Sequence, residues 1–239
     1  MVVYLDDILV FGRTPEEHLK NLETVLAILR DNQFYAKLSK CVFNKPEVKF
    51  LGHIVGRDGL KVNPAKVEVV SQWPRPTDVS HVRQFLGLTN YFRKFIQGYS
   101  SMAAPLSDLT KGTSDITGLW QPLHETAFQA LKLALVQAPV LRLPDFSLPF
   151  EVITDASLLG TGGVLQQDGH PIAFTSKKYL PAERNYTTTE QELLGVVHAL
   201  KEWRCYLEGS KIFLNVDHNP LTYFDTVRPR AVETYGPVG

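Results

Sequence analysis

Two adjacent carboxylates stand between two short apolar runs at the start of the chain. Residues 2–5 and 8–11 have the composition of short strands, so Asp6-Asp7 predicts a tight β-hairpin with acid at its tip. Adjacent negative charges at a sheet edge repel each other unless a cation neutralises them, and Mg²⁺ suits carboxylate oxygens. Two such ions can activate a 3′-hydroxyl and stabilise a leaving pyrophosphate in nucleotidyl transfer. A solvated Asp-Asp turn is the alternative reading of the bare motif.

The residues after this motif predict the elements that would support it. Thr14-Pro15-Glu16-Glu17 has the hydroxyl cap, early proline and acids of a helix start. Four leucines then recur at helical spacing, which predicts that one helix face packs on a sheet: Leu19, Leu22, Leu26 and Leu29. Short strands are expected at 34–38 and 48–55. The second turns through Arg57-Asp58-Gly59 into residues 60–62, because Asp-Gly is a strong hairpin signal.

The stretch Tyr4-Leu5-Asp6-Asp7-Ile8-Leu9-Val10-Phe11 closely resembles the palm hairpin of reverse transcriptases from gypsy-like long-terminal-repeat retrotransposons. The resemblance implies that Asp6 and Asp7 are catalytic and bind metal, and that Tyr4 contacts nucleic acid. In that family a third carboxylate on an earlier palm strand completes the metal site. The sequence begins three residues before the motif, so we expect two of the three acids and a chain that cannot polymerise on its own.

Two later segments resemble nucleic-acid-binding parts of the same family. Phe50-Leu51-Gly52-His53 resembles the primer grip, where Gly52 would let the backbone approach a sugar-phosphate closely. An ordinary strand glycine beside a surface histidine is the alternative. Residues 80–96 form an expected helix that resembles the family's thumb helix, which lies along the minor groove of the template-primer duplex. Its apolar stripe would be core: Val82, Phe85, Leu86, Thr89 and Phe92. The contacts to sugars and phosphates are expected from Gln84, Gly87, Asn90, Arg93 and Lys94.

Three further helices are predicted before the second half of the chain, at residues 63–73, 104–109 and 124–138. The last of them follows Trp120 and a polar loop, and this segment resembles the family's connection domain. Residues 139–149 contain three prolines and give the best predicted domain boundary in the chain.

The second half predicts an antiparallel meander followed by a helix and one more strand. The first strand ends in Asp155, a second begins at Gly160, and Asp168-Gly169 turns it back into residues 171–176. A helix is expected over 188–207, and a strand over 211–217 ends in another acid. This order of elements, with acids at strand ends and at a helix start, resembles the ribonuclease H fold of the same polyprotein family.

The resemblance assigns Asp155, Glu192 and Asp217 to three metal-binding catalytic acids of ribonuclease H. Carboxylates of this kind hold two Mg²⁺ ions, one generating hydroxide and the other neutralising the departing 3′ oxygen, with Mn²⁺ as a substitute. Glu190 competes with Glu192, although Thr187-Thr188-Thr189-Glu190 has capping-box spacing that gives Glu190 a structural role. Three buried-side residues, Val196, Ala199 and Trp203, share the face of Glu192. The family's fourth acid has no counterpart, since Asp225 and Glu233 are poor substitutes.

Composition and charge are consistent with this interpretation. The chain has 239 residues and 44% hydrophobic content, which is ample for folded cores. Its net charge is zero, yet residues 30–94 hold twelve Lys or Arg against five Asp or Glu, as a phosphate-binding track would. Scattered solubilising lysines are the alternative. Cys41 and Cys205 lie far apart and suggest neither a disulfide framework nor a zinc site. No secretory signal or apolar membrane span is visible.

The sequence therefore predicts an α+β and α/β multidomain chain from the reverse transcriptase and ribonuclease H region of a retrotransposon polyprotein. The expected division is a partial palm with the primer grip at 1–62, a thumb at 63–110, a connection at 111–148, an incomplete ribonuclease H-like domain at 149–225 and a divergent tail at 226–239. The family acts inside the cell, in cytoplasmic particles or the nucleus, on template-primer duplexes and RNA/DNA hybrids, beside other parts of the polyprotein and without a membrane. The alternative is a non-catalytic remnant that at most binds nucleic acid.

Overall fold

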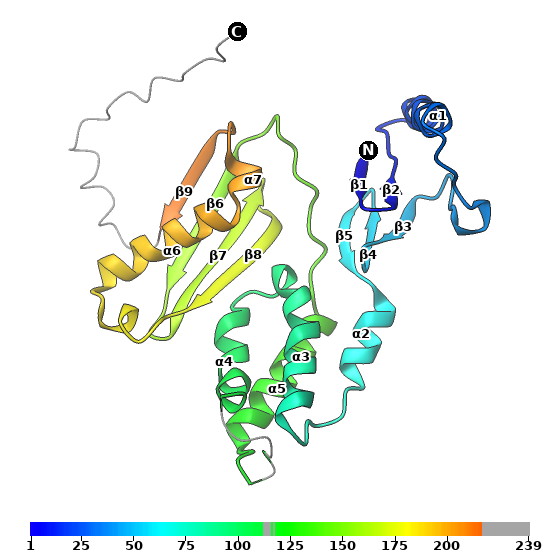
Figure 1. The fold of residues 1–239 in the computed structure, drawn as a ribbon. Helices are drawn as coiled ribbons and strands as arrows, with labels where there is room; N and C mark the ends of the chain where they lie inside the picture. The colour runs from blue at the N-terminus through cyan, green and yellow to red at the C-terminus, as the bar shows by residue number, and fades with distance from the viewer. Residues whose placement is uncertain (112–115, 117, 217–239) are drawn as a thin grey trace, which may run out of the picture.

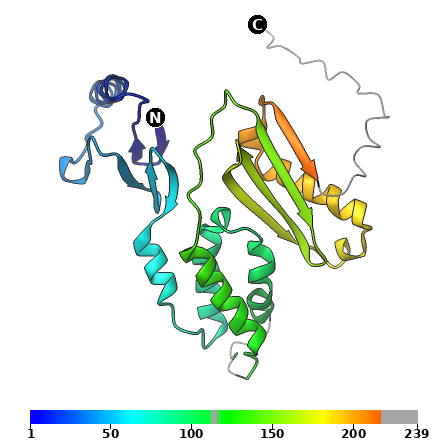
Figure 2. The ribbon, with the colours of Figure 1, turned by 180° about the vertical axis from the view of Figure 1, so that it is seen from behind.

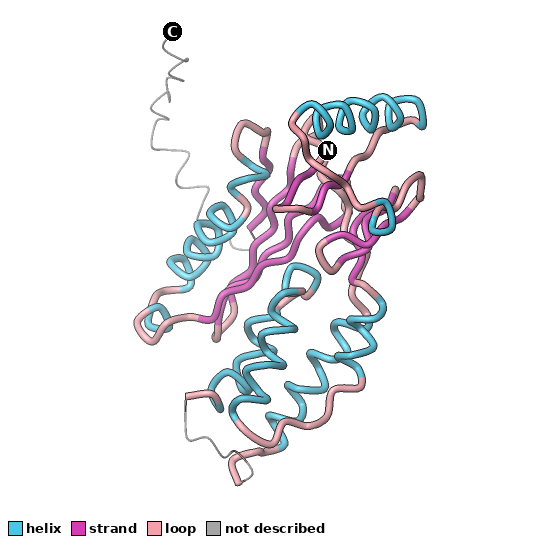
Figure 3. The backbone as a smooth tube through the Cα atoms, turned by 45° about the vertical axis from the view of Figure 1, so that its right-hand side comes forward, coloured by secondary structure: helices cyan, strands magenta, loops and turns pink. Residues whose placement is uncertain are grey.

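The computed structural model describes residues 1–111, 116 and 118–216 of the chain. Two small N-terminal sheets with helix α1, a bundle of helices α2–α5 and a four-stranded sheet covered by α6 follow one another along the chain (Figure 1). Helices α2–α5 gather at one end of the molecule, below the strands in the view of Figure 3. No helix within the described residues is long and apolar enough to cross a membrane.

The predicted acidic hairpin and the helix after it are both present. Strands β1 (Val2–Tyr4) and β2 (Asp7–Leu9) pair so that Tyr4 lies opposite Asp7. Helix α1 (Pro15–Asp31) begins at a Thr14 cap whose hydroxyl accepts from the Glu17 amide at 3.2 Å, as predicted. The expected packing of its leucine stripe holds only in part, because Leu22 and Leu29 are half-buried and Val25 between them is buried. Leu19 is 58% exposed and Leu26 45% exposed, so the other half of the stripe is uncovered.

A three-stranded sheet corrects two of the predicted strands. It contains β3 (Glu47–Phe50), β4 (His53–Gly56) and β5 (Gly59–Val62) in sequence order. Residues 48–55 are not one strand, because Leu51 and Gly52 both adopt positive φ angles and reverse the chain in a two-residue turn. The hairpin at the Asp-Gly signal is confirmed, with Gly56 paired to Gly59. The strand predicted at 34–38 is wrong; that segment precedes a 3₁₀ turn, η1 (Leu38–Lys40).

The helical bundle holds the larger of the two hydrophobic cores. It comprises α2 (Pro64–Ser71), α3 (Val79–Tyr91), η2 (Arg93–Phe95), α4 (Tyr99–Leu109) and α5 (Pro122–Val136). Four of the five stripe residues predicted for α3 are buried, while Leu86 is only partly so. The helix ends at Tyr91 and not at residue 96, because the tighter turn of η2 directs Phe95 into the core. Helix α4 starts five residues earlier than predicted, after Gly98 in the left-handed conformation.

The second core lies between one sheet and one helix. Strands β6 (Phe150–Ala156), β7 (Gly160–Gln167) and β8 (His170–Lys178) form the predicted meander, and β9 (Ile212–Val216) pairs parallel to β6. The strand order is β8-β7-β6-β9. Helices α6 (Thr188–Glu202) and α7 (Arg204–Leu207) cover one face of this sheet (Figures 1 and 2). The single helix predicted over 188–207 is interrupted at Trp203, whose buried ring fills the core.

The helical bundle also contacts the β8 edge of the large sheet. The Ser100 amide donates to the Ser176 hydroxyl at 2.8 Å, and the Ser100 hydroxyl donates to the Ser176 carbonyl at 2.7 Å. An ion pair of 2.9 Å joins Lys178 to Asp108 of α4. These contacts attach the sheet to α4 through polar groups at the side of the bundle.

Candidate active sites and nucleic-acid interface

The larger sheet and its helix bring two of the predicted acids into one region. Asp155 lies near the end of β6, exposed and paired with Gly162 of β7. Glu192 lies on the buried side of α6 and is only 5% exposed. One turn further along, a Cβ on Gly195 would lie 2.7 Å from the Thr161 hydroxyl oxygen, so α6 approaches β7 closely here. The close approach of helix and sheet is what carries the Glu192 carboxylate to the sheet.

Glu190 and Glu192 have clearly different environments. Glu190 completes the predicted capping box: its carboxylate accepts from the Thr187 amide at 2.8 Å and the Thr187 hydroxyl accepts from the Glu190 amide at 3.3 Å. The hydrogen bond from the Thr187 amide lowers the pKa of Glu190. Glu192 shares the sheet-facing side with Val196 and Ala199, which are buried as predicted. The structure therefore gives Glu190 the structural role at the helix start.

Tyr179, which the sequence analysis did not single out, stands beside these acids. It follows β8 directly, its amide donates to the Leu159 carbonyl at 3.0 Å, and it is 3% exposed. Its hydroxyl has no hydrogen-bond partner among the described residues. Burial raises the pKa of Tyr179, and the negative charges of Glu192, Glu183 and Asp155 raise it further. A lone tyrosine after a lysine pair carries no sequence signal, so only the fold reveals it.

The third predicted acid of this site, Asp217, lies outside the described residues, as do Asp225 and Glu233. The described part of β9 ends at Val216, which pairs with Thr154, the residue before Asp155. Among the described residues, no group of three or more His, Cys, Asp or Glu side chains is placed to hold a metal ion. The described half of the site thus consists of Asp155 and Glu192.

The acids of the N-terminal hairpin have a different setting. Asp6 and Asp7 are both exposed, and the two-residue turn between β1 and β2 consists of Leu5 and Asp6. Leu5 has a φ of 52°, which is unusual for a leucine and marks a strained tip. Tyr4 is also exposed, on the strand opposite Asp7. This hairpin presents its carboxylates to solvent with little packing around them.

The segment that resembles a primer grip is held against the end of α3. The Tyr91 hydroxyl donates to the Leu51 carbonyl at 2.5 Å. Gly52 has a φ of 72°, a backbone conformation that favours glycine, and it lies beside the Tyr91 ring. His53 is buried, so its alternative interpretation as a surface histidine is wrong. Its ring stacks on Tyr91 at 5.4 Å between ring centres. Burial, with a contribution from Lys94, lowers the pKa of His53 to about 4.

The face of α3 opposite its buried stripe is open. Gln84, Gly87 and Asn90 are exposed along it, and a Cβ on Gly87 would meet no atom within 4 Å. Arg93 and Lys94 are partly covered. Arg93 pairs with Glu202 of α6 at 2.5 Å, and the Lys94 ammonium lies 5.5 Å from the centre of the Phe95 ring. Burial lowers the pKa of Lys94.

Family models match both halves of the chain. The family described as reverse transcriptase (RNA-dependent DNA polymerase) matches residues 1–55, and the RNase H-like domain found in reverse transcriptase matches residues 120–214. Both families generally use divalent metal ions. These matches relate the segment with the acidic hairpin to reverse transcriptases and the segment with the acid-bearing sheet to their RNase H-like domain.

Comparison with curated proteins places it among retrotransposon Pol polyproteins. It is 42% identical over 227 residues to the retrovirus-related Pol polyprotein from transposon 297 of Drosophila melanogaster, covering 95% of this chain and 21% of the relative. Identity to the Pol polyprotein from transposon gypsy of the same organism is 38% over 232 residues, covering 92% of this chain and 22% of that protein. The chain belongs to the reverse transcriptase and RNase H region of the gypsy-like Pol polyproteins. It spans about a fifth of the length of these relatives.

Solved structures support the fold assignment. The foamy viral protease-reverse transcriptase in complex with RNA/DNA hybrid matches with a TM-score of 0.84 and 25% identity, covering 95% of this chain and 31% of that one. A complex of the foamy viral protein with double-stranded DNA matches with a TM-score of 0.82 and 26% identity, covering 94% and 48%. The predicted fold class, mixed α/β with reverse transcriptase and RNase H-like parts, is confirmed.

Proposed function

We propose that the sheet of β6–β9 with α6 hydrolyses the RNA strand of RNA/DNA hybrids. Asp155, Glu192 and Asp217 would hold two divalent ions, Mg²⁺ with Mn²⁺ as a substitute. The observation that supports this best is the burial of Glu192 on the sheet side of α6, close enough to Asp155 for both charges to raise the pKa of Tyr179. Burying a carboxylate costs several kcal/mol unless opposite charges or hydrogen bonds offset it, and a bound cation is one such charge.

The described residues fit a divalent cation by the chemistry of their donors. Carboxylate oxygens are the ligands that Mg²⁺ prefers, and a cation between Asp155 and Glu192 would offset their repulsion. Bound ions of this kind supply an activated water and stabilise the departing 3′ oxygen. The protein's own contribution is positioning: packing of α6 on β7 restricts Glu192, and the buried Tyr179 hydroxyl keeps its proton because its pKa is raised.

For the N-terminal half we propose the polymerase roles that the family resemblance suggests. Asp6 and Asp7 would bind the metal ions of nucleotidyl transfer, with Tyr4 beside the nucleic acid. The exposed tip of the hairpin supports this, because its carboxylates are accessible to a substrate and to ions. The relatives that carry this hairpin are much longer than the chain, so the activity belongs to the whole polyprotein's polymerase site.

The nucleic-acid contacts are proposed for the primer grip and for one face of α3. The grip comprises Phe50, Leu51, Gly52 and His53. The buried ring of His53 would support the grip indirectly, because it stacks on Tyr91, whose hydroxyl donates to the Leu51 carbonyl. On α3 the open residues Gln84, Gly87 and Asn90 would follow the minor groove, with Arg93 and Lys94 at the end of the helix. Template-primer duplexes and RNA/DNA hybrids are the proposed partners, since related foamy viral proteins form such complexes.

The division into palm (1–62), thumb (63–110), connection (111–148) and ribonuclease H-like part (149–225) remains part of this proposal. The described core supports a close association of thumb and connection. One buried cluster includes Phe85 of α3, Leu106 of α4 and Leu131 of α5. These two segments would move as one body.

The test is cleavage of an RNA/DNA hybrid labelled on its RNA strand, in Mg²⁺ and in Mn²⁺. We expect cleavage by the purified chain and its loss in Asp155→Asn. Glu208→Gln, an exposed acid on the same half that pairs with Arg204, is the matched control and should cleave normally. Folded protein that binds hybrid in a salt-sensitive way but never cleaves it would instead identify a non-catalytic, nucleic-acid-binding protein.

A further inference from the structure

The segment predicted as the domain boundary, residues 139–149, is hydrogen-bonded on both sides. Leu141 forms an antiparallel bridge with Leu60 of β5: its amide donates to the Leu60 carbonyl at 2.9 Å and its carbonyl accepts from the Leu60 amide at 2.7 Å. A Cβ on Gly59 would lie 2.2 Å from the Leu141 carbonyl oxygen, so only glycine admits this approach. Leu141 is fully buried in the core of the helical bundle.

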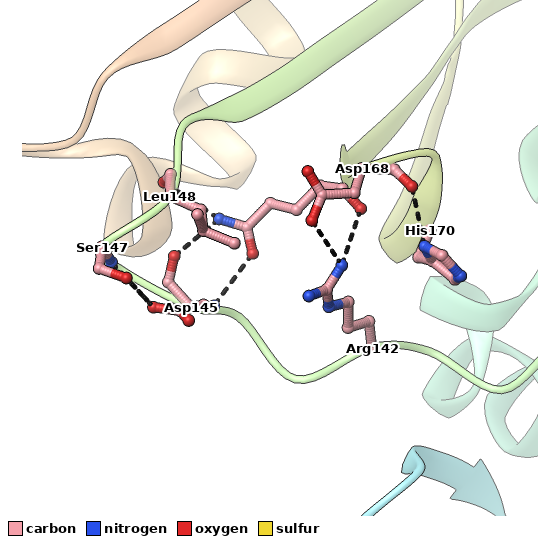
Figure 4. Close-up of polar contacts among 7 residues, drawn as sticks. Arg142, Asp145, Ser147, Leu148, Asp168 and His170 are labelled. Atoms are coloured by element: carbon pink, nitrogen blue, oxygen red, sulfur yellow. Dashed lines mark hydrogen bonds and ion pairs between the residues drawn. The ribbon is translucent and has the colours of Figure 1, made fainter.

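The next residue bonds in the opposite direction. The Arg142 amide donates to the Pro171 carbonyl of β8 at 2.8 Å. Its guanidinium donates to the Gln167 carbonyl at 3.3 Å and to the Asp168 carboxylate at 3.0 Å (Figure 4). Successive residues of an extended chain direct their backbone groups to opposite sides. Leu141 and Arg142 therefore join two different sheets, each at an edge strand.

A buried glutamine fixes the remainder of this segment. The side chain of Gln167 is fully buried, and its amide oxygen accepts from the Asp145 amide at 3.0 Å. Its amide nitrogen donates to the Asp145 carbonyl at 2.8 Å and to the Leu148 carbonyl at 3.2 Å (Figure 4). One side chain thus holds the backbone of the segment at two points.

These attachments are separate from the contact between the bundle and the β8 edge. There, Ser100 bonds to Ser176 and Asp108 pairs with Lys178, near the opposite end of β8 from Pro171. Two bodies joined at two separated points can neither rotate about one linker nor slide past each other freely. A linker attached only at its two ends would give neither restraint.

We propose that residues 139–149, which we call the strap, set a fixed separation between the primer-grip sheet and the sheet that carries Asp155. Leu141, Arg142 and Gln167 are then positioning residues. Resting on the proposed function, the consequence is that the strap determines how far from the primer terminus the RNA strand is cut. The primer-grip sheet and the sheet of Asp155 then contact the hybrid at a constant distance from each other, because the strap restricts their relative motion.

The test uses the two cysteines of the chain as native label sites. Cys41 lies between η1 and β3, and Cys205 lies in α7, so each half carries one. Nitroxide labels on both would give a distance distribution by pulsed electron paramagnetic resonance without any nucleic acid. Local motion of each label is the same in every variant, so changes in width report the relation between the halves.

We expect Arg142→Pro, which removes the amide donor to Pro171 and the guanidinium together, to broaden the distribution about twofold, because the strap then keeps only its attachments at Leu141 and Gln167. Arg142→Ala keeps the amide donor and should broaden the distribution less; its half-buried side chain lies outside both hydrophobic cores, so the variant should fold. Ser147→Ala, whose hydroxyl bonds only to Asp145 within the strap, is the matched control and should change nothing. Unchanged widths in both Arg142 variants would overturn the proposal.

Cleavage assays then separate this inference from the proposed function. On a hybrid with a recessed DNA 3′ end, wild-type cuts should cluster at one distance from that end, and the Arg142→Pro cuts should spread at an unchanged total rate. Cuts that stay clustered while the label distances broaden would overturn the positioning role. Absence of cleavage by every chain, including wild type, would count against the proposed function alone, because the distance measurement stands without it.

Discussion

The two acidic sites of this chain differ in how much folded structure surrounds them. Asp6 and Asp7 stand at the tip of a two-stranded hairpin, exposed and without a core of their own. Glu192 is buried on the side of α6 that faces the four-stranded sheet, and its charge and that of Asp155 both act on Tyr179. An isolated two-stranded hairpin is at best marginally stable, whereas a sheet covered by a helix can fix its side chains. The proposed metal-binding carboxylates thus depend on packing from elsewhere in the hairpin and on local packing in the larger sheet.

The difference extends to the helices that follow. In α1 two of the four stripe leucines, Leu19 and Leu26, are exposed, whereas α6 buries Val196 and Ala199 against the sheet. In the larger sheet, by contrast, the packing of α6 on β7 restricts the position of Glu192. Each prediction below tests one side of this contrast.

The largest expected effect separates the two acids of α6. Glu192→Gln should lower hybrid cleavage by about 1,000-fold, on the order of the several kcal/mol that metal-bound groups contribute to a transition state. Initial rates on a labelled hybrid measure it. Glu190→Gln is the matched control, since its amide oxygen can still cap the helix, and it should cleave within about twofold of wild type. Equal losses in both variants would show that the helix, and not the Glu192 carboxylate, is what matters.

The next prediction compares the loss of stability caused by truncating a leucine in the helical bundle and a leucine in α1. Leu131 is fully buried in the helical bundle, so Leu131→Ala should lower the free energy of unfolding by about 2–5 kcal/mol. Leu26→Ala in α1 should change it by less than about 0.5 kcal/mol, because that side chain is 45% exposed. Urea denaturation followed by circular dichroism compares the two variants. A large loss in Leu26→Ala would mean that α1 is packed in solution after all.

Much of this architecture could be predicted from local patterns. The Thr14 cap, the capping box at Thr187, the Asp-Gly hairpins and the meander of β6–β8 each rest on short-range chemistry, and all are present. The candidate ligand Glu192 could be preferred over Glu190 because the cap explained the latter. Its actual role remains a prediction that the cleavage assays test.

The failures arose where distant contacts decide. The sequence around residues 139–149 does not predict that Leu141 pairs with Leu60. Nor does it predict that the buried side chain of Gln167 in β7 donates a hydrogen bond to the backbone of this segment. The turn at Leu51 and Gly52 was missed because a run of apolar residues on both sides reads as one strand. The alternative of a surface histidine at position 53 could not be excluded from the sequence, because the burial of His53 depends on Tyr91, a residue of α3.

That buried histidine gives a pH-dependent prediction. Its pKa is lowered to about 4 in the folded chain, whereas the unfolded chain takes up the proton near the ordinary value of 6.5. Stability should therefore be lost as the pH falls from about 6.5 towards 4, by up to about 3 kcal/mol at the lower end. His53→Phe keeps an aromatic ring against Tyr91 but cannot titrate. Thermal melting at pH 7 and pH 4.5 should show a smaller difference for this variant than for wild type; an equal difference would assign the effect to carboxylates elsewhere.

The smallest effect concerns the open face of α3. Gly87 lies inside the helix and an added Cβ meets no atom, so Gly87→Ala should raise the free energy of unfolding by about 0.5–1 kcal/mol through helix propensity. If this face follows the minor groove, the same methyl group should weaken hybrid binding, because it fills space that the sugar-phosphate backbone needs. Fluorescence anisotropy with a labelled hybrid measures the affinity, and urea denaturation measures the stability. Weaker binding by a more stable variant could not be explained by damage to the fold. A variant that is more stable and binds as tightly as wild type would show that this face of α3 is not part of the interface.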